Sequence, residues 1–458
     1  MAELFQRFRP SQVIALSFTL IIFLGTSLLA LPFSRTDGKF GLGLDQLFTT
    51  VSALCVTGLA VVDTETYWTS IGHLVILALI KVGGFGIMAF TGLLALLVVN
   101  RLSMRASSYS SEEHRALKSG DIKTLLIRIA VVGFMIETLG TAILMLRLIS
   151  KYGYDIPDAF WHSLFHSVSA FNNAGFSLYS DNLVRFNADA VVMLTLCGEI
   201  ILGSLGFPVL LEIGRHLVRK AKSKPLGADR IFLTRWSLTS RIVIFGSAIL
   251  LFGGFIFFSA LEWNNPNSLG SMPTWQKLLN AFVLSVMPRT AGFNAIDISS
   301  LTHESWLGMD ILMFIGGGSG GTSGGIKIGT MAVLIFIVIS EVRNTRAVNI
   351  GKRRLPRSIH REAITLLFLY GFLLIAATLL LQLSTDFTTD QILFEVSSAL
   401  GTAGLSTGIT SHLPPFAEII IILLMFLGRV GPTLVASSLA VKIGKGYTQY
   451  PKERPTIG

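Results

Sequence analysis

Long apolar runs alternate with shorter amphipathic segments along this 458-residue chain, and the order apolar, amphipathic, apolar occurs four times. Each apolar run is about as long as one helical membrane crossing, which takes roughly 20 residues. The amphipathic segments are too short to cross, so each must enter and leave the membrane on one face. We therefore predict an all-α polytopic membrane protein of four tandem helix/pore-loop/helix units, with eight transmembrane helices and four re-entrant pore loops around a central pore.

Four short segments carry the repeat, and each has a glycine at its seventh position. They read "SALCVTGLA", "SAFNNAGFS", "VMPRTAGFN" and "SALGTAGLS". Their glycines are separated by 117, 117 and 112 residues and are Gly58, Gly175, Gly292 and Gly404. One unit of roughly 115 residues is thus used four times. The predicted units are residues 1–100, residues 120–218, residues 236–341 with a broken second helix, and residues 362–458 with a cytoplasmic C-terminal tail.

Composition strengthens the membrane assignment. Hydrophobic residues make up 51% of the chain and charged residues only 14%, which excludes an ordinary soluble domain. The first apolar run, residues 12–33, is not followed by a small-residue cleavage site, so we expect a retained helix. The net charge of +10 gathers in loops between the units. The positive-inside rule makes those loops cytoplasmic, and no nucleic-acid-binding motif accompanies them.

The repeated glycines have a chemical use in a pore. A cation that leaves water needs replacement oxygens, and backbone carbonyls arranged around an axis supply them without net charge. Glycine adopts the positive φ angles that turn carbonyls inward, and each short helix would point its negative dipole end at the same place. Asp45, Asp158 and Asp390 lie near the starts of three such helices, where a carboxylate suits the positive end. The predicted ion filter consists of Val56, Thr57, Gly58, Asn173, Ala174, Gly175, Thr290, Ala291, Gly292, Thr402, Ala403 and Gly404.

Carboxylates follow three of the four filter glycines. Asp63, Asp181 and Asp297 come five or six residues after them. A vestibule ring of this kind would concentrate cations outside the constriction. Aspartate is also common in turns, so three ordinary turn residues remain an alternative interpretation.

The stretch "GGGSGGTSGGIKIGT", residues 316–330, interrupts the second apolar run of the third unit. In a continuous helix each glycine would cost roughly 1 kcal/mol relative to alanine, so we predict an unwound loop that acts as a gate beneath the filter. Close packing of small residues is the alternative. Residues 316–321 match G-x-G-x-x-G, but no βαβ unit surrounds them, which argues against a nucleotide site. The predicted gate residues are Gly316, Gly317, Gly318, Ser319, Gly320, Gly321, Thr322, Ser323, Gly324, Gly325, Lys327 and Arg429.

Charged residues inside apolar helices are costly to insert and are therefore candidates for function. Arg429 lies at a depth comparable to the glycine stretch, so its charge would face the path below the filter. Lys81, Glu199 and Lys327 lie in corresponding regions of the other units. For Glu199, neutralisation of a neighbouring base is the alternative to a transport role.

Three further polar residues and the cysteines are interpreted structurally. Arg289, three residues before Gly292, is expected to brace its pore helix from behind. His162 and His166 have a metal-ligand spacing on a helix, but no third ligand is evident. The two cysteines lie in apolar surroundings and form no disulfide framework or metal site.

Together these motifs resemble a known family. Four helix/pore-loop/helix units with single filter glycines look like the TrkH, KtrB and plant HKT superfamily of cation transporters. The segments "TVSALCVTGLAVVDT", "HSVSAFNNAGFSL", "PRTAGFN", "MFLGRVGP" and "YPKERPTIG" are most similar to the KtrB branch, over nearly the whole chain. The resemblance implies sodium-dependent potassium uptake by the membrane subunit of a KtrAB-type system, in the bacterial cytoplasmic (inner) membrane, and no enzymatic activity.

The same resemblance implies partners and site roles. It implies a homodimer in contact with membrane lipid and a cytoplasmic RCK-type, KtrA-like regulatory ring, on which alone nucleotide would bind. No covalently bound cofactor is implied; potassium would occupy the filter, with sodium as a second ion. Glycine in all four filters goes with potassium over sodium in this superfamily, and Arg429 matches an arginine that raises a barrier to ions. The alternatives are a sodium-conducting protein, an alternating-access cation carrier or, from another class, a membrane enzyme. An enzyme would need polar catalytic groups that converge at the midplane, where this chain has almost no carboxylates.

Overall fold

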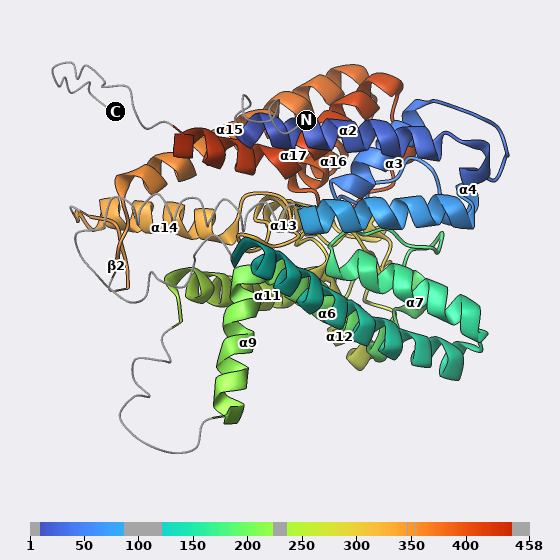
Figure 1. Cartoon of the computed structure of the whole chain (residues 1–458), viewed down its shortest axis with the longest axis horizontal. Coiled ribbons are helices and arrows are strands. Elements are labelled where there is room, and N and C mark those ends of the chain that lie inside the picture. Colours follow the sequence, from blue (N-terminus) through green and yellow to red (C-terminus); the bar gives the residue numbers. More distant parts are fainter. Residues whose placement is uncertain (1–9, 87–120, 223–235, 346, 352, 442–458) are drawn as a thin grey trace.

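The computed structural model describes residues 10–86, 121–222, 236–345, 347–351 and 353–441, and these residues are mostly helical (Figure 1). Among them, four helices are long and apolar enough to cross a membrane, or five if a bent pair counts as one span. The prediction of a mostly helical protein with several apolar spans is confirmed. One element departs from an all-α fold: a two-stranded hairpin of β1 (Asn349–Ile350) and β2 (Arg353–Arg354) pairs Ile350 with Arg353.

The helices follow the order expected from the sequence repeat. A long helix, a short helix and a second long or broken helix succeed one another four times. The first set is α2 (Pro10–Leu29), α3 (Leu44–Leu54) and Ser70–Gly86, and the second is α6 (Asp121–Tyr152), α7 (Ile156–Phe171), α8 (Ala190–Leu205) and α9 (Phe207–Lys222). The third is α11 (Leu238–Glu262), α12 (Thr274–Val286), α13 (His303–Phe314) and α14 (Ile328–Val342), and the fourth is α15 (Arg357–Ser384), α16 (Thr389–Gly401) and α17 (Pro415–Val441).

Capping groups and first-turn carboxylates stabilise the N-termini of the short helices. In α16, Thr388 Oγ1 accepts from Gln391 N while the Gln391 side chain accepts from Thr388 N at 3.2 Å, which is a capping box. Asp45, Asp158 and Asp390 lie in the first turns of α3, α7 and α16, as predicted from the sequence. The carboxylates there oppose the positive helix ends and leave the carbonyl ends pointing toward the filter segments.

The first long helix of each unit exposes large apolar side chains, whereas the short helices bury theirs. A phenylalanine or isoleucine on the outer face of each first helix is more than two-thirds exposed: Phe23 70%, Phe134 68%, Ile249 70% and Phe368 75%. By contrast, phenylalanines on the short helices and just after Gly292 are fully buried: Phe48, Phe165, Phe293 and Phe394. Large apolar side chains on the outside are expected where lipid replaces water as solvent.

Two of the second helices are broken rather than one. Helix α13 stops at Phe314 and α14 resumes at Ile328, as the glycine stretch predicts. Helices α8 and α9 also meet at a 103° bend, at Gly206 with φ +89°. The sequence prediction that only the third unit is interrupted is therefore wrong. Glycine is required at this bend, because its φ is positive and a Cβ at Gly206 would meet the carbonyl oxygen of Ser319 in the glycine stretch at 2.6 Å.

Candidate functional site

The four repeated glycines meet in a closed ring. A Cβ built on any one of them would come within 3.0 Å of a carbonyl oxygen from the next unit. Gly58 faces Ala174 O, Gly175 faces Ala291 O, Gly292 faces Ala403 O, and Gly404 closes the circle on Thr57 O. Segments more than 100 residues apart thus share one axis. Any side chain at these positions would displace a backbone carbonyl of its neighbour.

The backbone around each glycine repeats as well. The residue two before each glycine has a left-handed conformation: Val56 (φ 56°), Asn173 (φ 58°), Thr290 (φ 68°) and Thr402 (φ 49°). The glycines have φ between 71° and 96°. Each segment thus has two positive-φ residues separated by one position, a backbone conformation that the four units share. All twelve predicted filter residues thus lie in four segments that the structure brings together.

Hydrogen bonds hold three of the four turns in the same way. In the first unit Val56 N donates to Ala53 O at 3.1 Å and Thr57 N to Ser52 O at 2.8 Å. The second and fourth units repeat both bonds, through Ala174 N to Ser169 O and Ala403 N to Ser398 O among others. The third unit differs, since Ala291 N donates to Met287 O at 3.0 Å.

Hydroxyl groups of two serines that are not among the predicted filter residues brace two filter segments. Ser52 Oγ donates to Leu59 O at 2.7 Å and accepts from Gly58 N at 3.1 Å. Ser169 Oγ donates to Phe176 O at 2.8 Å in the equivalent place. Both serines occupy the first position of their repeated nine-residue segments, and this shared position could have identified them from the sequence.

A polar cavity of about 480 Å³ lies on one side of the glycine ring. Its lining includes Gly58, Gly292 and Gly404 together with Asp181 and Asp297. Asp63 is not among the lining residues. Each of these aspartates also has a local partner: Asp63 and Asp297 accept from backbone N–H groups at helix starts, and Asp181 pairs with Arg185 at 2.6 Å. A cation-concentrating role therefore stays a prediction beside an evident turn-capping role.

The glycine stretch forms an ordered loop between α13 and α14. Gly318 N donates to Ser204 O at 2.7 Å and Thr322 N to Gly203 O at 3.2 Å. In return Phe207 N, the first of α9, donates to Gly320 O at 3.1 Å. The loop is thus hydrogen-bonded to the break between α8 and α9, which satisfies backbone groups that lipid could not.

The same loop touches two filter segments. Thr322 Oγ1 lies 3.1 Å from Asn173 Oδ1 and 3.3 Å from Phe171 O. A Cβ at Gly324 would meet the Thr402 hydroxyl and Gly401 O, the latter at 2.8 Å. The loop therefore lies directly against the second and fourth filters. Small residues are needed there because backbone approaches backbone.

Two cations hold the loop carbonyls. Arg429, only 3% exposed, donates through one terminal nitrogen to Thr322 O and through the other to Gly83 O at 3.4 Å. Lys327 donates to Ser323 O and, at 3.4 Å, to Gly324 O. Both residues belong to the predicted gate, and the structure brings them to its loop. Arg429 in addition ties the loop to the helix Ser70–Gly86.

Lys81 and Glu199 do not form a pair. Lys81 Nζ binds the carboxylate of Glu137 on α6. Glu137 is only 3% exposed, and its carboxylate also accepts a hydrogen bond from Asn172 Nδ2 at 3.0 Å. Glu199 accepts from Ser167 Oγ at 2.5 Å, and its second oxygen has no hydrogen-bond partner within the described part of the chain. Among the described residues no basic side chain forms an ion pair with Glu199, so neutralisation of a neighbouring base is not seen, and Glu137 is not among the residues singled out from the sequence.

Arg289 and the two histidines lie behind the filters. Arg289 is 1% exposed and donates to Ser247 Oγ of α11 at 3.1 Å, consistent with bracing from behind. His166 Nε2 lies 3.0 Å from Ser177 Oγ, and its ring stacks on Tyr179. Within the residues that the structure describes, no group of three or more histidine, cysteine or acidic side chains could hold a metal ion.

Glycines of the other second helices pack against the short helices. A Cβ at Gly83, Gly203 or Gly428 would collide with the carbonyl oxygen of Leu54, Phe171 or Leu400, respectively. Each carbonyl comes four residues before a filter glycine, so the packing is equivalent in the three units. Close packing of small residues therefore explains these three glycines, whereas the third unit uses its glycines to unwind.

Comparisons with known proteins agree with this architecture. The TrkH family model, described as a cation transport protein, matches residues 6–444. Ktr system potassium uptake protein B of Bacillus subtilis is 35% identical over 445 residues, 97% of this chain and 96% of the relative. Potassium/sodium uptake protein NtpJ of Enterococcus hirae is 33% identical, covering 99% and 98%.

A solved structure supports the fold independently. The crystal structure of the potassium transporter TrkH from Vibrio parahaemolyticus matches with a TM-score of 0.70 at 17% identity, over 94% of this chain and 84% of that chain. Ktr system potassium uptake protein B of Vibrio alginolyticus is 35% identical over 94% of this chain and 91% of its own length. A family match over almost the whole chain, with relatives above 30% identity, shows that the chain belongs to the TrkH family of cation transport proteins.

Proposed function

We propose that this protein takes up potassium across the cytoplasmic membrane through a pore formed by its four units. The observation that carries the proposal is the closed ring in which each filter glycine faces a carbonyl of the next unit. Carbonyl oxygens on four sides replace the hydration shell of a monovalent cation. The printed names of the Bacillus and Vibrio relatives, potassium uptake proteins, support potassium as the ion.

In this proposal the described conformation is closed, and the glycine stretch is the gate. The loop lies against two filters and is held by Arg429 and Lys327 through its carbonyls. A guanidinium next to the ion path also raises an electrostatic barrier to cations. Opening would require the Arg429 contact to break and the loop to move away from Asn173.

The same proposal includes the membrane topology of the chain. Eight membrane helices and four re-entrant loops, with basic loops in the cytoplasm, agree with the fourfold helix order and the exposed apolar faces. The polar cavity beside the glycine ring would then be the outer vestibule. The family resemblance is the basis for proposing a homodimer, a KtrA-like RCK-type ring and sodium dependence. The words "Ktr system" in the relatives' names support a partner subunit.

Sodium conduction is the second candidate. The Enterococcus relative is called a potassium/sodium uptake protein and covers nearly all of this chain. Backbone carbonyls alone discriminate between the two ions by number and flexibility rather than by charge. The selectivity measurement below separates these candidates.

The test is rubidium, potassium and sodium flux into proteoliposomes, comparing wild type with a deletion of residues 317–325. We expect potassium flux to exceed sodium flux, and the deletion to raise flux while this preference survives, because none of the carbonyls that face the four glycines belongs to the loop. A well-folded deletion variant that transports nothing would contradict the gate and favour an alternating-access carrier. Sodium flux equal to or above potassium flux would favour the second candidate.

A further inference from the structure

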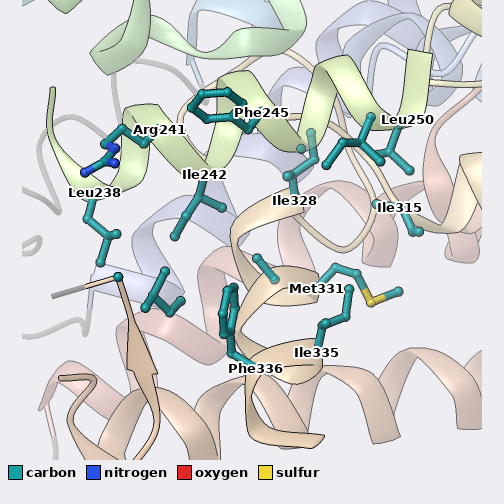
Figure 2. A pocket seen from close by; sticks show the side chains of 15 residues that line it. Leu238, Arg241, Ile242, Phe245, Leu250, Ile315, Ile328, Met331, Ile335 and Phe336 are labelled. Carbon is teal, nitrogen blue, oxygen red and sulfur yellow. The ribbon is translucent and has the colours of Figure 1, made fainter. Parts of the chain in front are cut away.

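An apolar cavity of about 470 Å³ lies between α11 and α14 (Figure 2), and no predicted filter residue lines it. Every lining side chain except Arg241 is hydrocarbon or thioether, and the other lining positions are glycines. Ligand pockets typically enclose about 300–1,000 Å³, so the size suits a bound molecule. With no polar lining beyond one arginine, the occupant must itself be largely apolar.

The cavity opens on the surface that faces the bilayer. Phe245, Ile249 and Ile335 on its rim are 65%, 70% and 52% exposed. Such side chains on the outside of a membrane protein contact lipid rather than water. Molecules that reach this cavity therefore come from the membrane, and acyl chains are its main component.

One end of the cavity is cationic. Arg241 lies in the first turn of α11, at the end of the cavity opposite Ile315 (Figure 2). Gly351 of the hairpin loop also lines the cavity, and the adjoining strand β2 exposes Arg353 and Arg354. No carboxylate within the described residues forms an ion pair with Arg241. A basic side chain at the membrane surface attracts anionic headgroups.

We propose that this cavity binds an acyl chain of an anionic phospholipid, with the lipid phosphate at Arg241, and that the bound lipid stabilises the closed gate. The binding part stands on the cavity and its charge alone. The regulatory part rests on the proposed function of the glycine stretch as a gate.

The cavity wall includes both ends of that stretch. Ile315 and Ile328 line the cavity and flank the loop, and Ile328 N donates to Gly317 O at 3.0 Å. Gly246 of α11 lies so close to Ile328 that a Cβ there would collide with it. A chain packed between α11 and α14 thus contacts the residues that anchor the loop as described. A ligand shifts a conformational equilibrium toward the state that it binds better, which here is the closed one.

Binding is tested with phosphatidylglycerol carrying a photoactivatable acyl chain, in vesicles of otherwise neutral phosphatidylcholine. We expect labelled peptides from residues 238–250 and 328–336. Ala332→Phe, which fills the cavity, should abolish this label, whereas Ala260→Phe, exposed on the outer part of α11, should not. Arg241→Gln should lower the preference for phosphatidylglycerol over phosphatidylcholine roughly fivefold, and Arg128→Gln, exposed on α6, should leave it unchanged.

The regulatory part is measured as potassium flux in the same vesicles. Phosphatidylglycerol should lower flux in the wild type and in both control variants, and have no effect in Ala332→Phe or Arg241→Gln. Label that survives Ala332→Phe, equal labelling by the neutral lipid, or cross-linking that shows a second copy covering the cavity would overturn the binding proposal. Labelling does not depend on transport, so absence of flux in all vesicles would contradict the proposed function and leave the lipid site standing.

Discussion

At the scale of single residues, the four predicted filter segments contain strained backbone. Val56, Thr290 and Thr402 are β-branched yet have positive φ, a conformation that such residues rarely adopt. Strain of this kind costs about 1–3 kcal/mol per residue and persists only where the surroundings impose it. Here the surroundings are the turn hydrogen bonds and the neighbouring carbonyls. The ring geometry is therefore sensitive to any added side chain.

The first prediction concerns the glycines themselves. Gly292→Ser or Gly58→Ser should lower the potassium-over-sodium flux ratio by about tenfold, equivalent to 1.4 kcal/mol, because the new Cβ displaces carbonyls of the neighbouring unit. Gly153→Ser is the matched control, since Gly153 has φ +71° but nothing within 4 Å of its Cβ position. Unchanged ratios in both filter variants would remove the filter assignment.

A second residue-scale prediction concerns Arg429. Arg429→Gln should raise potassium flux, because it removes the charge beside the path and the bond to Thr322 O. It should also lower the thermal midpoint in detergent, since buried carbonyls lose a donor at a cost of about 1–3 kcal/mol. Arg429→Lys keeps the charge with a single donor group, so an intermediate flux is expected. Equal fluxes in wild type and Arg429→Gln would argue against a role in closure.

At the scale of elements, each broken helix supports the other. Some amides of the glycine stretch bond within it, such as Gly316 N to Ile326 O at 2.8 Å, but those of Gly318 and Thr322 find acceptors only outside it, and the break at Gly206 frees carbonyls of α8. Hydrogen bonds between the two breaks, such as Gly318 N to Ser204 O, give partners both to the loop amides and to the α8 carbonyls. Movement of α9 would consequently pull on the loop, because Phe207 N holds Gly320 O.

The start of α8 yields an element-scale prediction. Asp189, just before α8, caps this helix and binds Arg147 at 2.9 Å and Lys151 at 2.8 Å on α6. Burial alone would raise its pKa, but hydrogen bonds from Lys151, Arg147 and Tyr152 outweigh burial and lower the pKa of Asp189 to about 2. Because the folded pKa is depressed, the stabilisation is present above the unfolded pKa of about 3.9 and is lost as the pH falls toward 2.

We therefore expect Asp189→Asn to destabilise the protein near neutral pH by about 1–2 kcal/mol, a modest value because both cations are partly exposed. The measurement is thermal unfolding in detergent across pH. Wild type and variant should converge as the pH approaches 2. Asp37→Asn, which removes an exposed pair with Arg35, is the control and should change little. A pH-independent difference between Asp189→Asn and wild type would contradict the linkage.

At the scale of the whole molecule, the four units complete one another. No unit forms a ring alone, and Gly404 of the last unit closes on Thr57 of the first. Helices from the beginning and the end of the chain lie together in Figure 1, where α2 runs beside α17. An ion at the centre would contact all four units and hold them together.

Ion binding should consequently stabilise the assembled molecule. At a potassium concentration ten times the dissociation constant, the folded state gains about 1.4 kcal/mol by mass action. We expect a higher thermal midpoint in potassium than in choline, measured at equal ionic strength, and loss of this difference in Gly404→Ser. The Gly153→Ser variant should keep it. A midpoint that does not respond to potassium in the wild type would speak against an ion site in the ring.

The sequence by itself determined the fourfold repeat, the short helices and the filter segments. Periodic glycines and apolar runs are local signals, and lipid forces every backbone amide into a helix or a protein-lined loop. The interruption between α13 and α14 was equally readable, because glycines in that density disfavour a helix.

Only the tertiary structure decided which residues from different units meet. The bend at Gly206 lacks a glycine run as dense as that of the third unit, and only the structure shows that the Ser319 carbonyl of another unit lies against it. The partner of Lys81 proved to be Glu137, 56 residues away, and nothing in the spacing along either helix announces that pair. Likewise Arg429 reaches both Thr322 and Gly83. Contacts of this kind depend on how helices are packed about the axis, which local patterns do not encode.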